Sequence, residues 1–420
     1  MTDTFTPPPR SPRDPYAALR YPEFRRLTVA TFLLTVGILV QEVLLGYEVY
    51  LLTRDPLALG FVGLAEAVPF IALALFGGHL ADRLDRLILM RWSLGAILAG
   101  SIVLAVLMQP AMRESLSTTT QLVAIYSTVF LLGLARGIYS PAASSLKAFL
   151  VPRELYPNSS VWMSSFWQAG AVTGPAVAGF AYAAFGLAGA LELVVVGLAI
   201  TLLLIFGIAR RPPVPGQAEN LWTSLREGLA YVYRTKAILY AITLDMVSVF
   251  FGGVLAILPI YAEDILRVGP EGLGVLRAAP SVGALVVMLV CAYYPPTERP
   301  WRNLLWAVTG FGVATLVFAV SPNFTLSIVM LFLTGATDSV SVIIRQTLLQ
   351  ALPPDHLRGR VVAVNSIFVT TSNELGAFES GVAAKLLGVV PSVIFGGVMT
   401  LATVGTIWRR SRELLAARLL

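Results

Sequence analysis

Charged side chains within long apolar runs are the feature of this sequence that could do chemistry. Asp245 lies in the apolar run 238–261, and Arg345 lies in the run 324–346. A carboxylate in an apolar medium holds a proton more readily than in water, whereas a nearby guanidinium favours its ionised form. An Asp–Arg pair could therefore bind and release a proton as its surroundings change. The alternative is a permanent ion pair that fixes helix packing.

Two such pairs are expected from the depths of the residues in their runs. At ~1.5 Å per residue of helix, Asp245 and Arg345 each lie ~10 Å from the same membrane surface, because their runs pass in opposite directions. Glu42 and Arg136 lie ~25 Å and ~21 Å from that surface, within one helical turn of each other. We therefore expect Asp245 with Arg345 to form the proton-coupling site, and Arg136 to act together with Glu42.

Further polar residues occupy comparable positions in the apolar runs. Even on lenient insertion scales, a charge at the centre of a membrane costs at least ~2.5 kcal/mol, so such residues usually form pairs or mark a pathway. An ion pair that serves packing remains the alternative for each. The residues that join the two pairs as candidates for a substrate cavity are Gln41, Glu48 and Asp338.

Other kinds of chemistry find little support in the sequence. The single cysteine, Cys291, excludes an intramolecular disulfide, and His79 and His356 are not spaced as a metal pair. There is no G-x-x-x-x-G-K-[ST] loop for ATP, and no nucleophile–base pair is apparent. We expect neither an enzyme nor a cofactor or metal site.

Composition places the chain in a membrane. Of its 420 residues, 56% are hydrophobic and 13% are charged, and the mean hydropathy is +0.77. Soluble domains have about 45–50% apolar and about 25% charged residues. The first residues are polar and rich in proline, without the apolar core of a cleavable signal. The fold class expected is an all-α polytopic membrane protein.

Twelve apolar runs are about as long as the ~20 residues that a membrane-spanning helix needs. They predict two bundles of six helices, at residues 25–210 and 237–410, after a leader at 1–24. Between them, residues 211–236 form a linker with an amphipathic helix, and 411–420 form a tail. The runs are 27–50, 58–76, 87–107, 121–140, 160–184, 187–208, 238–261, 273–292, 304–320, 324–346, 361–386 and 390–408.

The distribution of basic residues predicts the orientation. Lys and Arg cluster in the first segment, in every second loop after it and in the tail. The intervening loops hold only Arg54, Arg113 and Arg267. Cytoplasmic loops retain basic residues, so both termini are expected in the cytoplasm of a cell whose inner membrane holds the protein.

The two bundles repeat one another. A set of residues in the first half matches a set in the second half at an offset of 202, and an earlier set matches at 214. Five matches at one offset, at equivalent places in the order of spans, indicate a duplication. The pairs are Gly133 and Gly335, Pro152 and Pro354, Gly174 and Gly376, Gly179 and Gly381, Gly186 and Gly388, then Tyr47 and Tyr261, Leu59 and Leu273, Gly60 and Gly274, Ala65 and Ala279.

A charged hairpin between the second and third runs carries a family resemblance. The stretch 78–90 reads G-H-L-A-D-R-L-D-R-L-I-L-M, and it resembles the loop G-x-x-x-D-R-x-G-R-[RK] of the major facilitator superfamily. Asp85 and Leu87 depart from that pattern. The resemblance implies that the motif residues govern conformational change, with Asp82 set against the start of the eleventh span. These residues are Gly78, Asp82, Arg83 and Arg86.

A second motif lies in the fifth span. Gly170-Ala-Val-Thr-Gly174-Pro175-Ala-Val-Ala-Gly179 resembles the antiporter motif G-x-x-x-G-P-x-x-G-G of the same superfamily. Glycines four residues apart share one helix face and allow a neighbouring backbone to approach closely. Ordinary packing of small residues is the alternative explanation.

Within the superfamily, the chain resembles the twelve-span drug:proton antiporters of the macrolide-efflux and enterobactin-exporter type. That resemblance implies proton-coupled efflux of small amphipathic molecules by alternating access, with protons, a small-molecule substrate and the lipid bilayer as partners. Nucleic acid is not an expected partner, and the expected state is a monomer. The alternatives are a metabolite uniporter or importer and a lysophospholipid flippase of the same fold.

Overall fold

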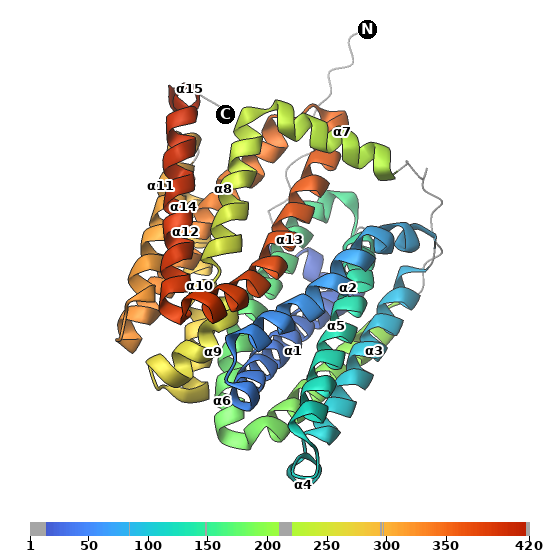
Figure 1. The fold of residues 1–420 in the computed structure, drawn as a ribbon. Helices are drawn as coiled ribbons and strands as arrows, with labels where there is room; N and C mark the ends of the chain where they lie inside the picture. The colour runs from blue at the N-terminus through green and yellow to red at the C-terminus, as the bar shows by residue number, and fades with distance from the viewer. Residues whose placement is uncertain are drawn as a thin grey trace.

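The computed structural model is built from α-helices (Figure 1), and the part of the chain that it describes contains no β-strand. It describes residues 14–83, 85–147, 149–209, 221–294, 296 and 298–416, without the side chains of 74–83, 221–224, 292, 355 and 416. The helices α7 (Leu221–Arg234) and α15 (Arg412–Ala416) lie at the top of Figure 1. We call this the terminal end, and the opposite end, which carries α4 (Pro110–Arg113), the α4 end.

The first half of the chain forms one bundle. Its long helices run alternately between the two ends, joined by short connections such as the two residues between α1 and α2. Its elements are η1 (Ala18–Arg20), α1 (Pro22–Thr53), α2 (Pro56–Arg83), α3 (Arg86–Leu107), α4, α5 (Thr118–Lys147), η2 (Arg153–Leu155) and α6 (Tyr156–Phe206).

The second half forms the other bundle, in which α7 packs against α8 and α13. Val232 is buried there, and the backbone of α13 touches α7 at Gly228. A helix thus lies within residues 211–236, where the sequence predicts an amphipathic one, and it packs with the second half. The elements after α7 are α8 (Lys236–Gly252), η3 (Leu255–Ile257), α9 (Leu258–Ile260), the π-helix η4 (Tyr261–Ile265), α10 (Gly269–Tyr293), α11 (Pro300–Ala319), α12 (Phe324–Ala351), α13 (Asp355–Leu387), α14 (Val389–Arg410) and α15.

Ten helices within the described residues are long and apolar enough to cross a membrane, fewer than the twelve predicted. Two features account for the difference. α6 spans 51 residues but contains non-helical backbone at Gly186, with φ 66°, so it consists of two arms that correspond to two predicted spans. α13 is 33 residues long and is not among the ten, because Asn, Ser, Thr and Glu residues interrupt its apolar sequence.

The predicted span 238–261 is interrupted, which corrects the expectation of one continuous helix. α8 ends at Gly252, and Gly253 has extended backbone before η3 begins. A Cβ on Gly396 of α14 would lie 1.8 Å from the carbonyl oxygen of Phe251, so α14 lies directly against the end of α8. Glycine at these positions allows α14 to pack against the break.

The two halves cross at two equivalent places, which agrees with a duplication. In one crossing α2 meets α13, where a Cβ on Gly381 would lie 2.6 Å from the Cα of Gly60. In the other α6 meets α10, where a Cβ on Gly179 would lie 2.9 Å from the Cα of Gly274. These four glycines form two of the matched pairs, so each crossing is the counterpart of the other. Both crossings lie toward the α4 end.

Within each half, a matched glycine also braces a neighbouring helix. A Cβ on Gly133 of α5 would lie 2.3 Å from the carbonyl oxygen of Glu66 in α2. A Cβ on Gly335 of α12 would lie 1.9 Å from the carbonyl oxygen of Pro280 in α10. The backbone of α2 is therefore held in place at Glu66 by a contact in which no larger residue fits.

Replacing Gly179 should open the crossing between α6 and α10. In Gly179→Val, the new side chain would meet backbone atoms of Pro270 and Gly274, which cannot move as a flexible side chain would. We expect a larger distance across the α4 end and a loss of transport. Electron spin resonance distances between labels at the exposed Ser115 and Val320 measure the opening.

Gly197→Val is the matched control, because it lies in the same helix with nothing within 4 Å of its Cβ position. An unchanged distance between the labels in a folded Gly179→Val protein would show that the crossing does not depend on the absence of a side chain at residue 179.

Candidate functional site

A cavity of about 910 Å³ lies between the two halves. Helices α1, α2, α3, α5 and α6 of the first half line it together with η3, α10 and α13 of the second half. It extends from Leu27 and Lys147, near the terminal end, to Gly46 and Leu59, near the α4 end. Its volume falls within the range of about 300–1,000 Å³ that is usual for small-molecule sites.

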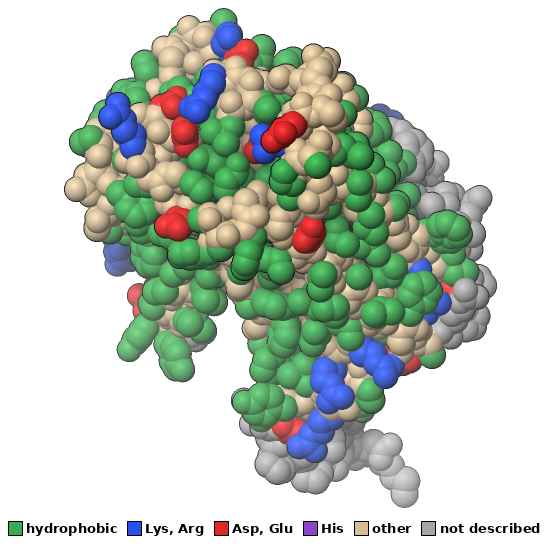
Figure 2. Space-filling model, turned by 90° about the horizontal axis from the view of Figure 1, so that it is seen from below, with side chains coloured by type: hydrophobic (Ala, Val, Ile, Leu, Met, Phe, Trp, Pro, Cys, Tyr) green, Lys and Arg blue, Asp and Glu red, His purple; other side chains and the backbone are tan. Residues whose placement is uncertain are grey.

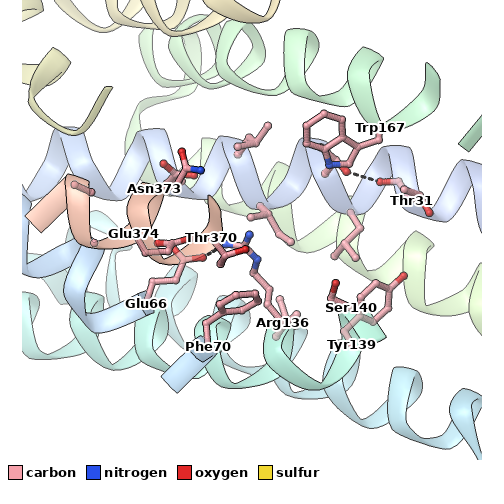
Figure 3. Close-up of a pocket in the computed structure, with 18 of the residues that line it drawn as sticks. Thr31, Glu66, Phe70, Arg136, Tyr139, Ser140, Trp167, Thr370, Asn373 and Glu374 are labelled. Atoms are coloured by element: carbon pink, nitrogen blue, oxygen red, sulfur yellow. Dashed lines mark hydrogen bonds and ion pairs between the residues drawn. The ribbon is translucent and has the colours of Figure 1, made fainter. Parts of the chain in front are cut away.

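The centre of the cavity holds an ion pair from the first half (Figure 3). Arg136 of α5 donates to the carboxylate of Glu66 of α2, and the guanidinium carbon of Arg136 lies 5.6 Å from the ring centre of Phe70. Glu66 is buried, at 6% exposed. The α2 backbone at Glu66 is the part that Gly133 holds in place, so the carboxylate has a fixed position.

Glu374 of α13 approaches this pair from the second half. Figure 3 shows its carboxylate on the same side of the cavity as Glu66 and Arg136, next to Thr370 and Asn373 of its own helix. Electrostatic interactions join Glu374 to both members of the pair. Glu374 is involved in no hydrogen bond or ion pair with a described residue, so it is a cavity carboxylate without a partner of its own.

A second ion pair crosses the cavity from one half to the other. Arg277 of α10 donates to Glu42 of α1 at 2.8 Å and to the carbonyl oxygen of Leu255 at 3.0 Å. The Arg277 side chain is 9% exposed and that of Glu42 is 35% exposed. The contact ties α1 to α10 on the wall of the cavity.

The predicted pairing of Arg136 with Glu42 is corrected by these contacts. Both residues line the cavity, as expected, but Arg136 pairs with Glu66, and Glu42 pairs with Arg277. The estimated depths put Arg136 and Glu42 at one level in the membrane, but depth does not determine which residues pair. The rotation of each helix about its axis decides which side chains meet.

Asp245 and Arg345 meet as predicted, but away from the cavity. They form an ion pair between α8 and α12, with side chains 4% and 3% exposed, and neither lines the cavity. Asp338 lies beside them, on a small pocket of about 10 Å³ that Asp245 and Ser248 also line. That volume is about what a single water molecule needs. The pair is enclosed by protein.

Gln41 and Glu48 also lie outside the cavity wall, contrary to expectation. Gln41 accepts a hydrogen bond from Ser101 of α3 at 2.9 Å. Glu48 pairs with Arg113 of α4 and accepts a hydrogen bond from Tyr182 at 3.2 Å. The cavity face of α1 carries Thr31, Thr35, Ile38, Glu42 and Gly46 at helical spacing, so residues 41 and 48 fall on another face.

The structure describes side chains at only one end of the charged hairpin, from Asp85 onward. Those of Gly78, Asp82 and Arg83 lie outside them, so the proposed contact of Asp82 stays a prediction. Asp85, which departs from the family pattern, accepts a hydrogen bond from the backbone of Leu87 at 2.9 Å and caps α3. The guanidinium carbon of Arg86 lies 4.7 Å from the ring centre of Phe149.

The antiporter motif packs α6 against helices of both halves. Cβ atoms on Gly170 and Gly174 would lie 2.8 Å and 2.9 Å from the side chains of Thr35 and Leu39 of α1. The carbonyl oxygen of Pro175 lies against Gly274 of α10, where Gly179 forms the crossing. The spacing of small residues therefore brings α6 close to α1 on one side and to α10 on the other.

Side chains join the halves at the α4 end. Arg54, which caps α1 with φ 50°, contacts Glu263 at 3.4 Å and Asp264 at 3.1 Å in the π-helix. Tyr47 donates to Glu263 at 2.7 Å, and Tyr50 donates to Asp264. Acidic and basic side chains also lie close together on the face seen from below in Figure 2. These contacts and the glycine crossings close the cavity at the α4 end.

A further contact at this end joins Asp55, between α1 and α2, to Lys385 of α13 at 3.0 Å. Burial would raise the pKa of Asp55, but the N–H of Leu57 and the ammonium of Lys385 outweigh it and hold the pKa below its usual range. The stabilisation from a lowered pKa is present above the usual value and is lost as the pH falls through the lowered one. The Asp55 carboxylate is therefore ionised between pH 5 and 8, as the ion pair requires.

Comparison with known families agrees with this architecture. A model of the Major Facilitator Superfamily matches residues 27–377. The chain belongs to this superfamily. It is therefore an integral membrane protein and a transporter rather than an enzyme.

The superfamily relatives that match include exporters. The enterobactin exporter EntS of Shigella flexneri is 26% identical over 385 residues, which cover 90% of this chain and 88% of that protein. EntS of Salmonella choleraesuis (strain SC-B67) is 26% identical over 408 residues, 94% of each chain.

Solved structures of the superfamily share the fold at low identity. A bacterial homologue of the iron transporter ferroportin, in an inward-facing state, has a TM-score of 0.71 and 18% identity over 95% of this chain and 99% of that one. The nucleoside transporter NupG has a TM-score of 0.71 and 12% identity over 93% of this chain and 99% of that one.

Sequence reasoning missed Glu66, Glu374 and Arg277 as central cavity residues. Each is a charge within an apolar helix, so each carried the signal that identified the other candidates. Their nearness to one another depends on how α2, α10 and α13 are rotated about their axes, which hydropathy does not report.

The Arg136–Glu66 pair should be needed both for folding and for transport. Arg136→Ala leaves the buried carboxylate of Glu66 without a counter-charge, which destabilises a protein by about 3–5 kcal/mol. Replacing both residues by Met should recover most of that stability, because no buried charge remains, while transport stays lost. Thermal unfolding followed by tryptophan fluorescence measures the first effect.

Glu42→Ala is the comparison variant, and it should cost less stability because Arg277, the charge it leaves, keeps its hydrogen bond to the carbonyl oxygen of Leu255 at 3.0 Å. Equal and mild losses of stability and transport in Arg136→Ala and Glu42→Ala would contradict this assignment.

Neutralising the acids of the π-helix should open the α4 end. In Glu263→Gln with Asp264→Asn, Arg54 loses both ionic partners, and a two-state population should shift by up to about fivefold per contact. The distance between labels at Ser115 and Val320 should lengthen in a larger fraction of molecules. Glu271→Gln, an exposed change on the neighbouring α10, should leave the distribution unaltered.

Proposed function

We propose that the protein is a secondary active transporter that exports small amphipathic molecules in exchange for protons by alternating access. The observation that carries the proposal is a cavity between the two halves, lined by ionisable side chains and closed at the α4 end. The EntS relatives, which are named as exporters, support the direction of transport.

The proposed orientation follows from the basic residues, which gather at the terminal end. With both termini in the cytoplasm and the protein in the inner membrane, the α4 end faces outward. The cavity, closed at the α4 end, then extends toward the cytoplasm past Thr31 and Met163. A cavity closed on the outer side and reached from the inner side is in the state in which an exporter loads its substrate.

The lining of the cavity supports an amphipathic substrate. Leu34, Ile38, Val62 and Ile97 contribute apolar surface, which would bind the hydrophobic part of a ligand. Thr31, Asn373 and the two ion pairs offer polar groups at defined positions. A molecule that is both apolar and polar matches such a wall better than a fully hydrophilic metabolite does.

Proton coupling requires a carboxylate whose surroundings change as the cavity opens and closes. The carboxylates of Glu42, Glu66 and Glu374 meet this requirement, because they line the cavity. Asp245 is enclosed with Arg345, so we propose that this pair serves helix packing, the alternative that the sequence left open.

Asp245→Asn should therefore reduce stability but retain coupling. The variant removes one member of a buried pair and leaves Arg345 without its counter-charge, which destabilises the folded state. Accumulation driven by a pH gradient should persist per folded molecule. Loss of that accumulation with downhill exchange intact would instead make Asp245 the proton carrier.

Reconstitution into liposomes tests the function itself. With an imposed pH gradient and a panel of fluorescent amphipathic molecules, we expect accumulation that stops when the gradient is dissipated. Downhill movement alone would indicate a uniporter or an importer. Movement of labelled lysophospholipid between leaflets, without movement of the panel, would indicate a flippase of the same fold. Either result contradicts the proposal.

A further inference from the structure

The charges of the cavity centre do not balance. Glu42, Glu66 and Glu374 contribute three carboxylates, whereas Arg136 and Arg277 contribute two guanidinium groups. Each guanidinium already contacts one carboxylate, Arg136 that of Glu66 and Arg277 that of Glu42. Glu374 is left as the excess negative charge. When Glu374 is ionised, a cation could bind beside it without displacing an arginine.

Two acidic groups on elements packed against α13 form ion pairs elsewhere. Asp245 of α8 pairs with Arg345, and Glu227 of α7 pairs with Arg360. Arg360 lies about 21 Å along α13 from Glu374, at about 1.5 Å per residue. Lys385, toward the α4 end of the same helix, contacts Asp55.

Lys147 is the remaining cation on the cavity wall, and it lies toward the terminal end. Its ammonium contacts the hydroxyl of Ser160 at 3.0 Å. It is separated from Arg136 by about three turns of α5, or about 16 Å. Lys147 therefore does not neutralise the excess carboxylate at the centre.

Aromatic side chains complete a site suited to a cation. Phe70, Tyr139 and Trp167 line the cavity. Phe70 lies beside Arg136, whereas Tyr139 lies beside Ser140 and Trp167 lies near Thr31 (Figure 3), and the indole of Trp167 is 53% exposed. The faces of aromatic rings attract cations, and their carbon surface binds apolar groups. A carboxylate in a cavity that aromatic side chains also line is a suitable site for a lipophilic cation.

We propose that Glu374 binds the positive group of a cationic amphipathic substrate, and that the substrate and a proton occupy this carboxylate in turn. The inference rests on the proposed transport function and names its substrate class. A proton on Glu374 removes the negative charge that binds the cation. Binding of the proton therefore releases the cation, and binding of the cation releases the proton. Glu374 belongs to the second half, and Glu66 and Arg136 belong to the first. Binding of a proton or a cation at Glu374 therefore changes the electrostatic interactions between the two halves.

Binding of tetraphenylphosphonium to the purified full-length protein tests the inference. Tetraphenylborate has the same shape and the opposite charge, so it separates charge recognition from hydrophobic binding. At pH 8 we expect tetraphenylphosphonium to bind at least about tenfold more tightly than tetraphenylborate, because the excess charge is negative. Affinity for the cation should fall as the pH is lowered to 6.

Two variants of α13 make the test specific. Glu374→Gln keeps the shape of the side chain and should weaken cation binding by about tenfold and remove its dependence on pH. Glu379→Gln, a neutralisation five residues further along the same helix and not on the cavity wall, should change neither. Elution of each variant as a single peak by size-exclusion chromatography confirms that it is folded.

The outcomes distinguish this inference from the proposed function. Unchanged cation binding in Glu374→Gln, or equal affinity for the two probes, overturns the inference. If the liposomes still accumulate neutral or anionic molecules under a pH gradient, the transport proposal survives that result. Cation binding that depends on Glu374, in a protein that accumulates nothing, would support the inference and reject the transport proposal.

Discussion

The pairing of charges inside apolar helices is the constraint on which the rest of the structure depends. A charge within the membrane must meet a counter-charge, a hydrogen-bond partner or an aqueous cavity. Asp245 and Arg345 satisfy this requirement within the second half, and Glu48 satisfies it with Arg113 in the first half. Because each of these pairs joins helices of a single half, each half can move as a unit without separating them.

The pairs that border the cavity are of a different kind. Arg277 reaches from the second half to Glu42 in the first, and Glu374 faces Arg136 from across the same boundary. Any motion that separates the halves at this level must change the surroundings of these groups. The charges most sensitive to conformation are therefore those in contact with the cavity, which is the arrangement that coupling between binding and motion requires.

Much of the fold could be predicted from the sequence because the length and hydropathy of a membrane-spanning helix are properties of its own residues. Length and hydropathy placed the helices, and the matched glycines indicated a duplication. Two of the matched pairs, Gly60 with Gly274 and Gly179 with Gly381, form the equivalent crossings. The break after Gly252 could not be predicted, since it depends on the close approach of α14. The same limit applies to the site: Asp245 and Arg345 were matched by depth, but only helix rotation decides that Glu374 faces the cavity while Asp245 does not.

The closed end is held by two kinds of contact with different tolerance to motion. The glycine crossings bring backbones together without side chains, so they can separate and re-form without repacking a core. The contacts of Arg54 with the π-helix, and of Lys385 with Asp55, are partly exposed ion pairs whose charges water can solvate when they part. Both contacts can therefore open at modest free-energy cost, whereas the buried pairs within each half cannot. The positions of the weak and strong contacts in the chain thus define where the molecule can move, and the cavity lies between the parts that move.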